Sequence, residues 1–285
     1  MLSSPPTPSH LAVANELARA TNLNNLTFKA QGAFKETFRA ETVHGTVVAL
    51  KILDPSKCDL ARTSREIEAL QRCDSPYIAK LFDSGTFHAS DGKDYFFAVE
   101  EFLDGGTLTD RLTTAALSPD QVKSYAACLV RALDHLRSLN LVHRDIKPDN
   151  IMFRLGADLP VLVDFGLVRD LSAISLTQTW LPQGPGTPYY AAPEQLHNDK
   201  ALIGWRTDQF SLGIVLGIGL TGRHPFERPG MTMPQTVGVV AARQSCSNEF
   251  MQAANDAGLA GIVQMLAPWP IHRYSSPRRL LEVFE

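Results

Sequence analysis

The pattern of hydrophobic and polar positions divides the chain into a strand-rich first part and a helix-rich remainder. Residues 11–20 carry apolar side chains near a 3.6-residue period, which predicts a short helix that leans on the first part. Residues 26–53 are rich in Thr, Val and Phe and predict strands. His44-Gly45 lies where a hairpin turn between two of these strands is expected.

The next segments extend this strand-rich part. Residues 60–73 predict an amphipathic helix, and residues 78–87 and 95–101 predict two further strands around a turn at Asp91-Gly92. Asp104-Gly105-Gly106 then breaks the pattern, because glycine pairs mark turns and loops.

Most of the chain beyond residue 106 has helical patterning. Ser118 is a suitable N-cap for a helix with Pro119 in its first turn, running toward Leu139. Residues 161–163 predict a short buried strand. The apolar run 210–220 has 11 residues, too few for a bilayer span of about 20, and predicts a buried core helix.

Composition narrows the class of protein. The chain has 285 residues, 44% of them hydrophobic, and a net charge of −3, so no strong attraction to nucleic acid is expected. The four cysteines are scattered, without the spacing of a zinc or redox site. Residues 1–10 are expected to be a disordered tail without a signal sequence, and we expect a cytoplasmic protein without a membrane span.

The strongest motif is the run His143-Arg144-Asp145-Ile146-Lys147-Pro148-Asp149-Asn150, followed by Asp164-Phe165-Gly166. It places a carboxylate, a lysine, an amide and a second carboxylate within 20 residues. These groups suit the alignment of a hydroxyl, a phosphoryl group and a magnesium ion, which is what phosphoryl transfer requires.

These motifs resemble the catalytic loop and metal motif of the eukaryotic-type (Hanks-type) serine/threonine protein kinase family, from about Leu26 to the C-terminus. The resemblance implies an α+β, bilobal kinase-like fold, with a small antiparallel sheet and one main helix in the N-lobe and a larger α-helical C-lobe. The expected boundaries are 1–21 for a tail and possible short helix, 22–101 for the N-lobe and 102–285 for the C-lobe. A cleft between such halves is a natural nucleotide site.

The resemblance also assigns roles in the catalytic loop. Asp145 would orient the substrate hydroxyl and accept its proton, and Lys147 would stabilise the migrating phosphate. Asn150 and Asp164 would bind Mg²⁺, or Mn²⁺, with ATP as phosphate donor.

A second group of candidates lies in the strand-rich part. Lys51 would reach the α- and β-phosphates, and Ala49, on the same strand face, would leave room for the base. A lysine at such a site needs an anchoring carboxylate. Glu66 is favoured over Glu68, because Leu70 lies one helical turn from Glu66 on the inner face.

The family's glycine-rich loop is degenerate in this chain. Within residues 30–37 only Gly32 remains of three glycines, while Phe34 keeps the aromatic tip. A loop with fewer glycines is expected to be stiffer, which bears on nucleotide affinity. Lys35 stands in a position where another kinase group carries its phosphate lysine; because Lys51 is present, an auxiliary or solvated role is favoured.

The segment after the last strand is expected to meet the adenine. Alignment with the family hinge places the backbone of Glu101 and Leu103 against the adenine edge and Glu100 at the gatekeeper position, which is usually apolar. A register shifted by one residue is the alternative. A buried carboxylate at Glu100 requires a partner.

Further residues resemble the family's scaffold and activation segment. Asp208 would cap the catalytic-loop backbone, and Glu194 of Ala192-Pro193-Glu194 would pair with Arg273. Arg144 and Arg169 form a basic pair that would bind a phosphate. The candidates for phosphorylation are Ser172, Ser175, Thr177 and Thr179, and Thr187 would contact Asp145 and Lys147.

Three functions are compatible with these motifs. An active serine/threonine protein kinase regulated by autophosphorylation is favoured. A pseudokinase scaffold is the first alternative, although it need not keep Lys51, Glu66, Asp145, Asn150 and Asp164 together. A small-molecule kinase is the second, disfavoured by Thr187 and the Ala192-Pro193-Glu194 element. The protein substrate and oligomeric state are not indicated.

Overall fold

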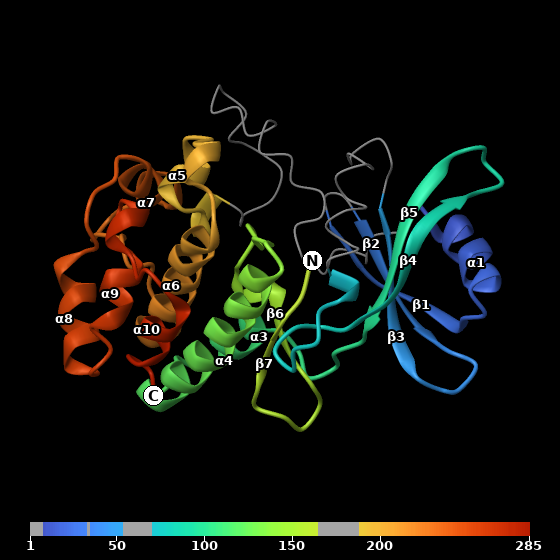
Figure 1. Cartoon of the computed structure of the whole chain (residues 1–285), viewed down its shortest axis with the longest axis horizontal. Helices are drawn as coiled ribbons and strands as arrows, with labels where there is room; N and C mark the ends of the chain where they lie inside the picture. Colours follow the sequence, from blue (N-terminus) through green and yellow to red (C-terminus); the bar gives the residue numbers. More distant parts are fainter. Residues whose placement is uncertain (1–7, 33–34, 54–69, 165–187) are drawn as a thin grey trace. The chain divides into compact units, whose positions relative to one another are not determined.

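The computed structural model describes residues 8–32, 35–53, 70–164 and 188–285, which belong to two compact units. Of the described residues, 8–32, 35–53, 70–74 and 79–102 belong to the first unit, and 75–78, 103–164 and 188–285 belong to the second. Figure 1 shows an antiparallel sheet in the first and most of the helices in the second. The expected α+β kinase-like fold class is confirmed.

The sheet of the first unit has five antiparallel strands in the order β1-β2-β3-β5-β4. Gly45 closes the predicted hairpin between β2 and β3 with a φ of 79°, a left-handed conformation that glycine adopts without strain. Gly92 does the same between β4 and β5 with a φ of 81°. The strands are β1 (Asn24–Gln31), β2 (Lys35–Glu41), β3 (Val47–Leu53), β4 (Leu81–His88) and β5 (Asp94–Glu101).

One strand boundary was predicted too early. The fourth strand begins at Leu81, whereas Ile78 forms an isolated parallel bridge with Leu162. The backbone explains the difference, because the Leu162 N–H donates to the Tyr77 carbonyl at 2.9 Å. The chain is therefore held in the second unit at Ile78 and returns to the first unit at Ala79.

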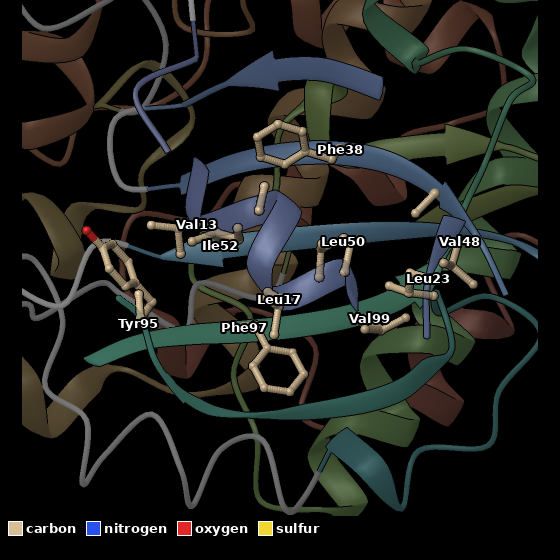
Figure 2. Close-up of a cluster of buried hydrophobic side chains, with 14 residues drawn as sticks. Val13, Leu17, Leu23, Phe38, Val48, Leu50, Ile52, Tyr95, Phe97 and Val99 are labelled. Atoms are coloured by element: carbon tan, nitrogen blue, oxygen red, sulfur yellow. The ribbon is translucent and has the colours of Figure 1, made fainter. Parts of the chain in front are cut away.

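The helix α1 (Leu11–Ala20) covers one face of this sheet, as its amphipathic pattern predicted. Alternation along β3 turns Val48, Leu50 and Ile52 toward α1 (Figure 2). The shared core is completed by a set of apolar side chains from α1 and the neighbouring strands: Val13, Ala14, Leu17, Ala18, Leu23, Phe38, Ala40, Tyr95, Phe97 and Val99.

A buried carboxylate on β2 holds the start of α1. Glu36 is 1% exposed and accepts hydrogen bonds from the backbone N–H of Ser9 at 2.8 Å and of His10 at 3.0 Å. These donors precede the helix, where backbone N–H groups lack partners within the helix. The contact fixes α1 against the strand that follows the glycine loop.

The second unit is helical, with a small two-stranded sheet. Its longest helix, α4, begins as predicted: Ser118 Oγ accepts from the Gln121 N–H at 3.2 Å, and the Gln121 side chain accepts from the Ser118 N–H at 3.0 Å. The elements are α3 (Leu108–Thr114), α4 (Pro119–Ser138), β6 (Ile151–Phe153), β7 (Pro160–Leu162), α5 (Pro193–Leu196), α6 (Trp205–Thr221), α7 (Met233–Ala241), α8 (Asn248–Asp256), α9 (Gly261–Met265) and α10 (Pro277–Leu281).

The apolar run 210–220 lies inside α6, and nearly all of its side chains are buried. The predicted core helix is therefore confirmed. Among the helices that the structure describes, none has both the length and the apolar character to cross a bilayer. The predicted disordered tail over residues 1–10 is wrong at its described end, because Glu36 holds the backbone N–H groups of Ser9 and His10. Residues 1–7 and most of the helix predicted over 60–73 lie outside the described residues.

Candidate active site

Lys51 lies near the middle of β3, on the sheet face opposite to α1. Ala49 pairs directly with Glu100 of β5, and Lys51 pairs with Ala98, so Ala49, Lys51 and Glu100 share one face. Lys51 Nζ and Glu100 Oε2 form an ion pair, and each side chain is only 9% exposed. The partner that Glu100 was expected to need is therefore Lys51.

The other expected partner of Lys51 is not tested. Glu66 and its rival Glu68 lie outside the described residues, so the assignment of Glu66 stays a prediction. Sequence reasoning found that Glu100 needs a partner but did not identify it, since the answer depends on the register between β3 and β5. Long side chains on diagonal neighbours of adjacent antiparallel strands can reach one another, and Lys51 and Glu100 are such neighbours. Once the register of β3 and β5 is known, this spacing identifies the pair.

The expected adenine-facing segment follows directly. Glu100 is 7% exposed, whereas Glu101 is half-buried. The Glu101 N–H donates to the Lys80 carbonyl at 2.8 Å, which fixes the end of β5. Ala49, in the first unit, is 6% exposed, and Leu103, in the second, is 5% exposed.

Gly32, the glycine that remains in the degenerate loop, lies between β1 and β2. The Gly32 N–H donates to the Lys35 carbonyl at 2.8 Å, and a Cβ on Gly32 would lie 3.7 Å from that carbonyl oxygen, an ordinary contact. This backbone therefore does not require glycine at Gly32. Lys35 pairs with Leu53 and Thr37 with Lys51, which puts both lysines on one sheet face. Phe34 lies outside the described residues.

The second unit holds the catalytic-loop candidates together around Asp145. Asp145 Oδ2 accepts from Lys147 Nζ at 3.1 Å and from Asn150 Nδ2 at 3.1 Å. Pro148 begins a 3₁₀ turn (Pro148–Asn150) that returns Asn150 to the loop, where Nδ2 also donates to the Asp145 carbonyl at 2.7 Å. The Asp145 and Lys147 side chains are 17% and 21% exposed, so both retain access to solvent.

Backbone hydrogen bonds bring Asp164 beside this loop. The Val163 N–H donates to the Asn150 carbonyl at 2.9 Å. His143 links the two motifs, because its Nε2 bonds to the Val163 carbonyl at 2.9 Å and its Nδ1 accepts from the Asp145 N–H at 3.3 Å. Asp164 itself has a φ of 60°, an uncommon conformation that often marks a functional turn.

The donor set of Asn150 and Asp164 fits a magnesium ion. The Asn150 amide nitrogen is engaged by Asp145, which leaves the amide oxygen available as a ligand, and Asp164 offers a carboxylate. Mg²⁺ is commonly bound by one or two protein oxygens together with water and substrate phosphates. The described ranges contain no cluster of three or more His, Cys, Asp or Glu side chains suited to a metal held by protein alone.

Asp208 caps the catalytic loop from α6, as predicted. Its two carboxylate oxygens accept from the backbone N–H groups of His143 at 2.7 Å and Arg144 at 2.8 Å. Burial raises the pKa of Asp208 to about 7, against the lowering effect of these two hydrogen bonds. Arg144 needs this support because its φ is 66°.

Glu194 forms the predicted ion pair with Arg273, and both side chains are fully buried. The geometry is bidentate, with distances of 2.6 Å and 3.0 Å. The neighbouring Gln195, which sequence reasoning missed, donates from Nε2 to the Arg144 carbonyl at 2.9 Å. Gln195 therefore ties the Ala192-Pro193-Glu194 element to the catalytic loop.

His224 is a second residue that sequence reasoning missed. Its Nε2 bonds to the Tyr189 carbonyl at 2.9 Å, and its Nδ1 accepts from the Phe226 N–H at 3.2 Å. Burial lowers the pKa of His224 to about 4. The neutral imidazole therefore holds the turn Pro188–Tyr190, which lies just before the Ala192-Pro193-Glu194 element.

The regulatory candidates are only partly described. Arg144 is held by the contacts above, whereas Arg169, Thr177, Thr179 and Thr187 lie outside the described residues, as do Ser172 and Ser175. Their roles stay predictions.

Comparison with known proteins agrees with this geometry. Residues 30–282 match the model of the protein kinase domain. The chain is 31% identical over 254 residues to CBL-interacting serine/threonine-protein kinase 9 of Arabidopsis thaliana, covering 86% of this chain and 53% of the relative. It is 34% identical over 202 residues to serine/threonine-protein kinase PknD of Mycobacterium tuberculosis, covering 69% of this chain and 29% of the relative.

A sheet unit with a paired lysine and a helical unit with an Asp-Lys-Asn loop define a kinase domain. The chain belongs to the protein kinase family. It spans about half or less of the length of the curated relatives described here.

Proposed function

We propose that this chain is an ATP-dependent serine/threonine protein kinase, which transfers the γ-phosphate of ATP to hydroxyl groups of a protein substrate. The observation that carries the proposal is the convergence of Lys147 and Asn150 on the Asp145 carboxylate. Both relatives described above are named serine/threonine-protein kinases, which supports it.

Each residue then has a role in the transfer. Asp145 orients the substrate hydroxyl and accepts its proton, and Lys147 neutralises charge on the moving phosphoryl group. Lys51 holds the α- and β-phosphates with the help of Glu66. Mg²⁺ or Mn²⁺, held by Asn150 and Asp164, supplies charge neutralisation on the phosphates when bound.

The nucleotide is contacted by a further set of residues. Its base lies over Ala49 and meets the backbone of Glu101 and Leu103, and the loop carrying Gly32 and Phe34 covers its phosphates. We assign residues 22–101 and 102–285 to the two lobes of one kinase domain. The cytoplasm is the expected location.

Regulation by autophosphorylation extends the proposal. Phosphate on Thr177 or Thr179 binds Arg144 and Arg169 and orders the segment that precedes Thr187. Charge-assisted contacts between phosphate and guanidinium groups are strong enough to order a loop.

The test is transfer of radiolabelled γ-phosphate from magnesium ATP to generic protein substrates, followed by phosphoamino-acid analysis. Wild type is expected to label Ser and Thr, and Asp145→Asn is expected to lose at least about 100-fold in rate, the usual contribution of a positioned general base. Asp149→Asn, which removes an exposed carboxylate from the same loop, is the matched control. Binding of ATP with no transfer to protein would instead support a small-molecule kinase, and loss of ATP binding a scaffold.

A further inference from the structure

The buried pair between Lys51 and Glu100 does not follow from the motifs that identify the family. We propose that Glu100 is a positioning residue for ATP, whose carboxylate holds the Lys51 ammonium group where it meets the nucleotide phosphates. The inference rests on the proposed function, since it assigns a device for binding the same ATP.

The position of the pair is set by the sheet itself. β3 and β5 pair without a bulge over six consecutive residue pairs, from Val48–Glu101 to Leu53–Phe96. Lys51 and Glu100 are diagonal neighbours in this ladder, so their separation is fixed by backbone hydrogen bonds. A lysine held in this way loses less side-chain freedom when it binds phosphate.

The surroundings of the pair are apolar. Leu53, Phe96 and Ala98 are buried on the same face and form one cluster with Leu81, which pairs directly with Glu100. A charge in such surroundings requires a counter-charge, and the attraction between Lys51 and Glu100 is stronger there than in water.

Stability alone does not explain an ion pair at this place. Apolar residues of similar volume in place of both members of a buried ion pair are often neutral or stabilising, whereas removal of one member leaves the other charge buried and unpaired. Apolar residues at positions 51 and 100 would together extend the cluster of Leu81, Phe96 and Ala98. Glu100 is therefore best explained by its effect on Lys51.

The base site adjoins the same carboxylate. Ala49 lies directly opposite Glu100 and two residues before Lys51 on the same face. A base over Ala49 would lie beside Glu100, and the phosphates would lie at Lys51. Two ligands therefore separate the base from the phosphates: adenosine, without phosphates, and the non-hydrolysable ATP analogue AMP-PNP.

The experiment measures the binding of both ligands by titration calorimetry in the presence of magnesium. The quantity of interest is the ratio of AMP-PNP affinity to adenosine affinity. Glu100→Gln keeps the side-chain volume and removes the charge, and we expect this ratio to fall by about tenfold while adenosine affinity is unchanged. The matched control is Asp94→Asn, on the same strand as Glu100. It removes an exposed carboxylate that pairs with His88 of β4, and we expect it to keep the wild-type ratio.

Two further variants test whether Glu100 acts through Lys51. Lys51→Met is expected to lower the ratio at least as much as Glu100→Gln, and the double variant no further than Lys51→Met alone. Glu100→Asp keeps the charge with a shorter reach and is expected to lose less of the ratio than Glu100→Gln. If Glu100→Gln does not fold, the comparison of Glu100→Asp with wild type decides.

Three results would overturn the inference. Equal weakening of both ligands would show a purely structural role for Glu100. Unchanged affinity for both ligands would show that the phosphates do not depend on Glu100, and a raised ratio would show that Glu100 withholds Lys51 from the phosphates. If wild type itself shows no preference for AMP-PNP over adenosine, the proposed function fails as well. If wild type prefers AMP-PNP and Glu100→Gln keeps that preference, only the role of Glu100 fails.

Discussion

Carboxylates in this protein have different tasks according to the groups around them. Asp145 contacts the side chains of Lys147 and Asn150 and keeps access to solvent. Asp208 is buried and contacts backbone N–H groups, while Glu194 is buried against a guanidinium. Only the first environment suits contact with a substrate, so the other two carboxylates serve the loop's geometry.

Replacing Asp208 tests this division. Asp208→Asn puts an amide N–H₂ group against one of two backbone donors and leaves that donor without an acceptor. We expect the free energy of unfolding to fall by about 1–3 kcal/mol and the phosphoryl-transfer rate to fall at saturating ATP. Denaturant unfolding and initial rates measure both. The control is Asp256→Asn, which removes an exposed carboxylate on α8 that contacts Gln252. If Asp208→Asn transfers phosphate as fast as this control, the role of Asp208 is contradicted.

The elements of the second unit position the loop through close packing on α6. Asp208 lies in the first turn of α6, and Gly213, Gly217 and Gly219 follow along the helix. A Cβ at Gly217 would lie 2.5 Å from Pro225 Cγ and 3.0 Å from Phe250 Cε2. These glycines therefore allow neighbouring segments to approach the helix that carries Asp208.

A pair of glycine variants tests this packing. Gly217→Ala is expected to lower the free energy of unfolding by about 1–3 kcal/mol, because the added methyl group overpacks the contact with Pro225. Gly238→Ala on α7 meets nothing within 4 Å and is expected to raise stability by up to about 1 kcal/mol through helix propensity. Chemical denaturation compares the two, and equal effects would refute the packing argument.

The link between the turn Pro188–Tyr190 and the α6–α7 connection, made by His224, predicts a pH dependence of stability. The pKa of His224 is lowered from 6.5 to about 4, so the folded protein holds the neutral imidazole. The contribution of the neutral imidazole to the free energy of unfolding is complete above about pH 6.5. It is lost as the pH falls from 6.5 toward 4, because only the unfolded chain then binds the proton, and the total loss is about 3 kcal/mol. His224→Gln cannot titrate, and its stability difference from wild type should shrink over this range.

Urea unfolding at several pH values measures this effect. His44→Gln, in the exposed β2–β3 turn, controls for the removal of one imidazole. Parallel stability curves for wild type and His224→Gln between pH 7 and 4 would contradict the assignment.

At the scale of the whole molecule, α1 lies outside the residues that match the kinase domain. The family match begins at residue 30, whereas α1 ends at Ala20. Glu36 binds the start of α1, and the helix buries the sheet face opposite to Lys51 and Glu100. One face of the sheet is thus closed by the chain's own helix, and the other carries the pair assigned to nucleotide binding.

Local features of this molecule were accessible from the sequence. The amphipathic period of residues 11–20, the cap at Ser118 and the turns at Gly45 and Gly92 each depend on neighbouring residues and were predicted. The ion pair of Glu194 and Arg273 followed from family resemblance, although 79 positions separate the two residues.

Contacts that depend on long-range register were not accessible. The pair of Lys51 and Glu100 requires the alignment of β3 with β5, and the sequence pattern fixes each strand's faces but not that alignment. The bond from Gln195 to the Arg144 carbonyl depends on a backbone group, which no side-chain motif reveals.

The central claim is that Asp145 and its neighbours make this chain an active serine/threonine kinase. The most direct measurement is the mass of purified wild type and Asp145→Asn after incubation with magnesium ATP, with phosphate mapped by peptide mass spectrometry. We expect phosphate on Ser or Thr within residues 172–187 in wild type and none in Asp145→Asn. Phosphate in neither protein, with ATP binding retained in both, would contradict it.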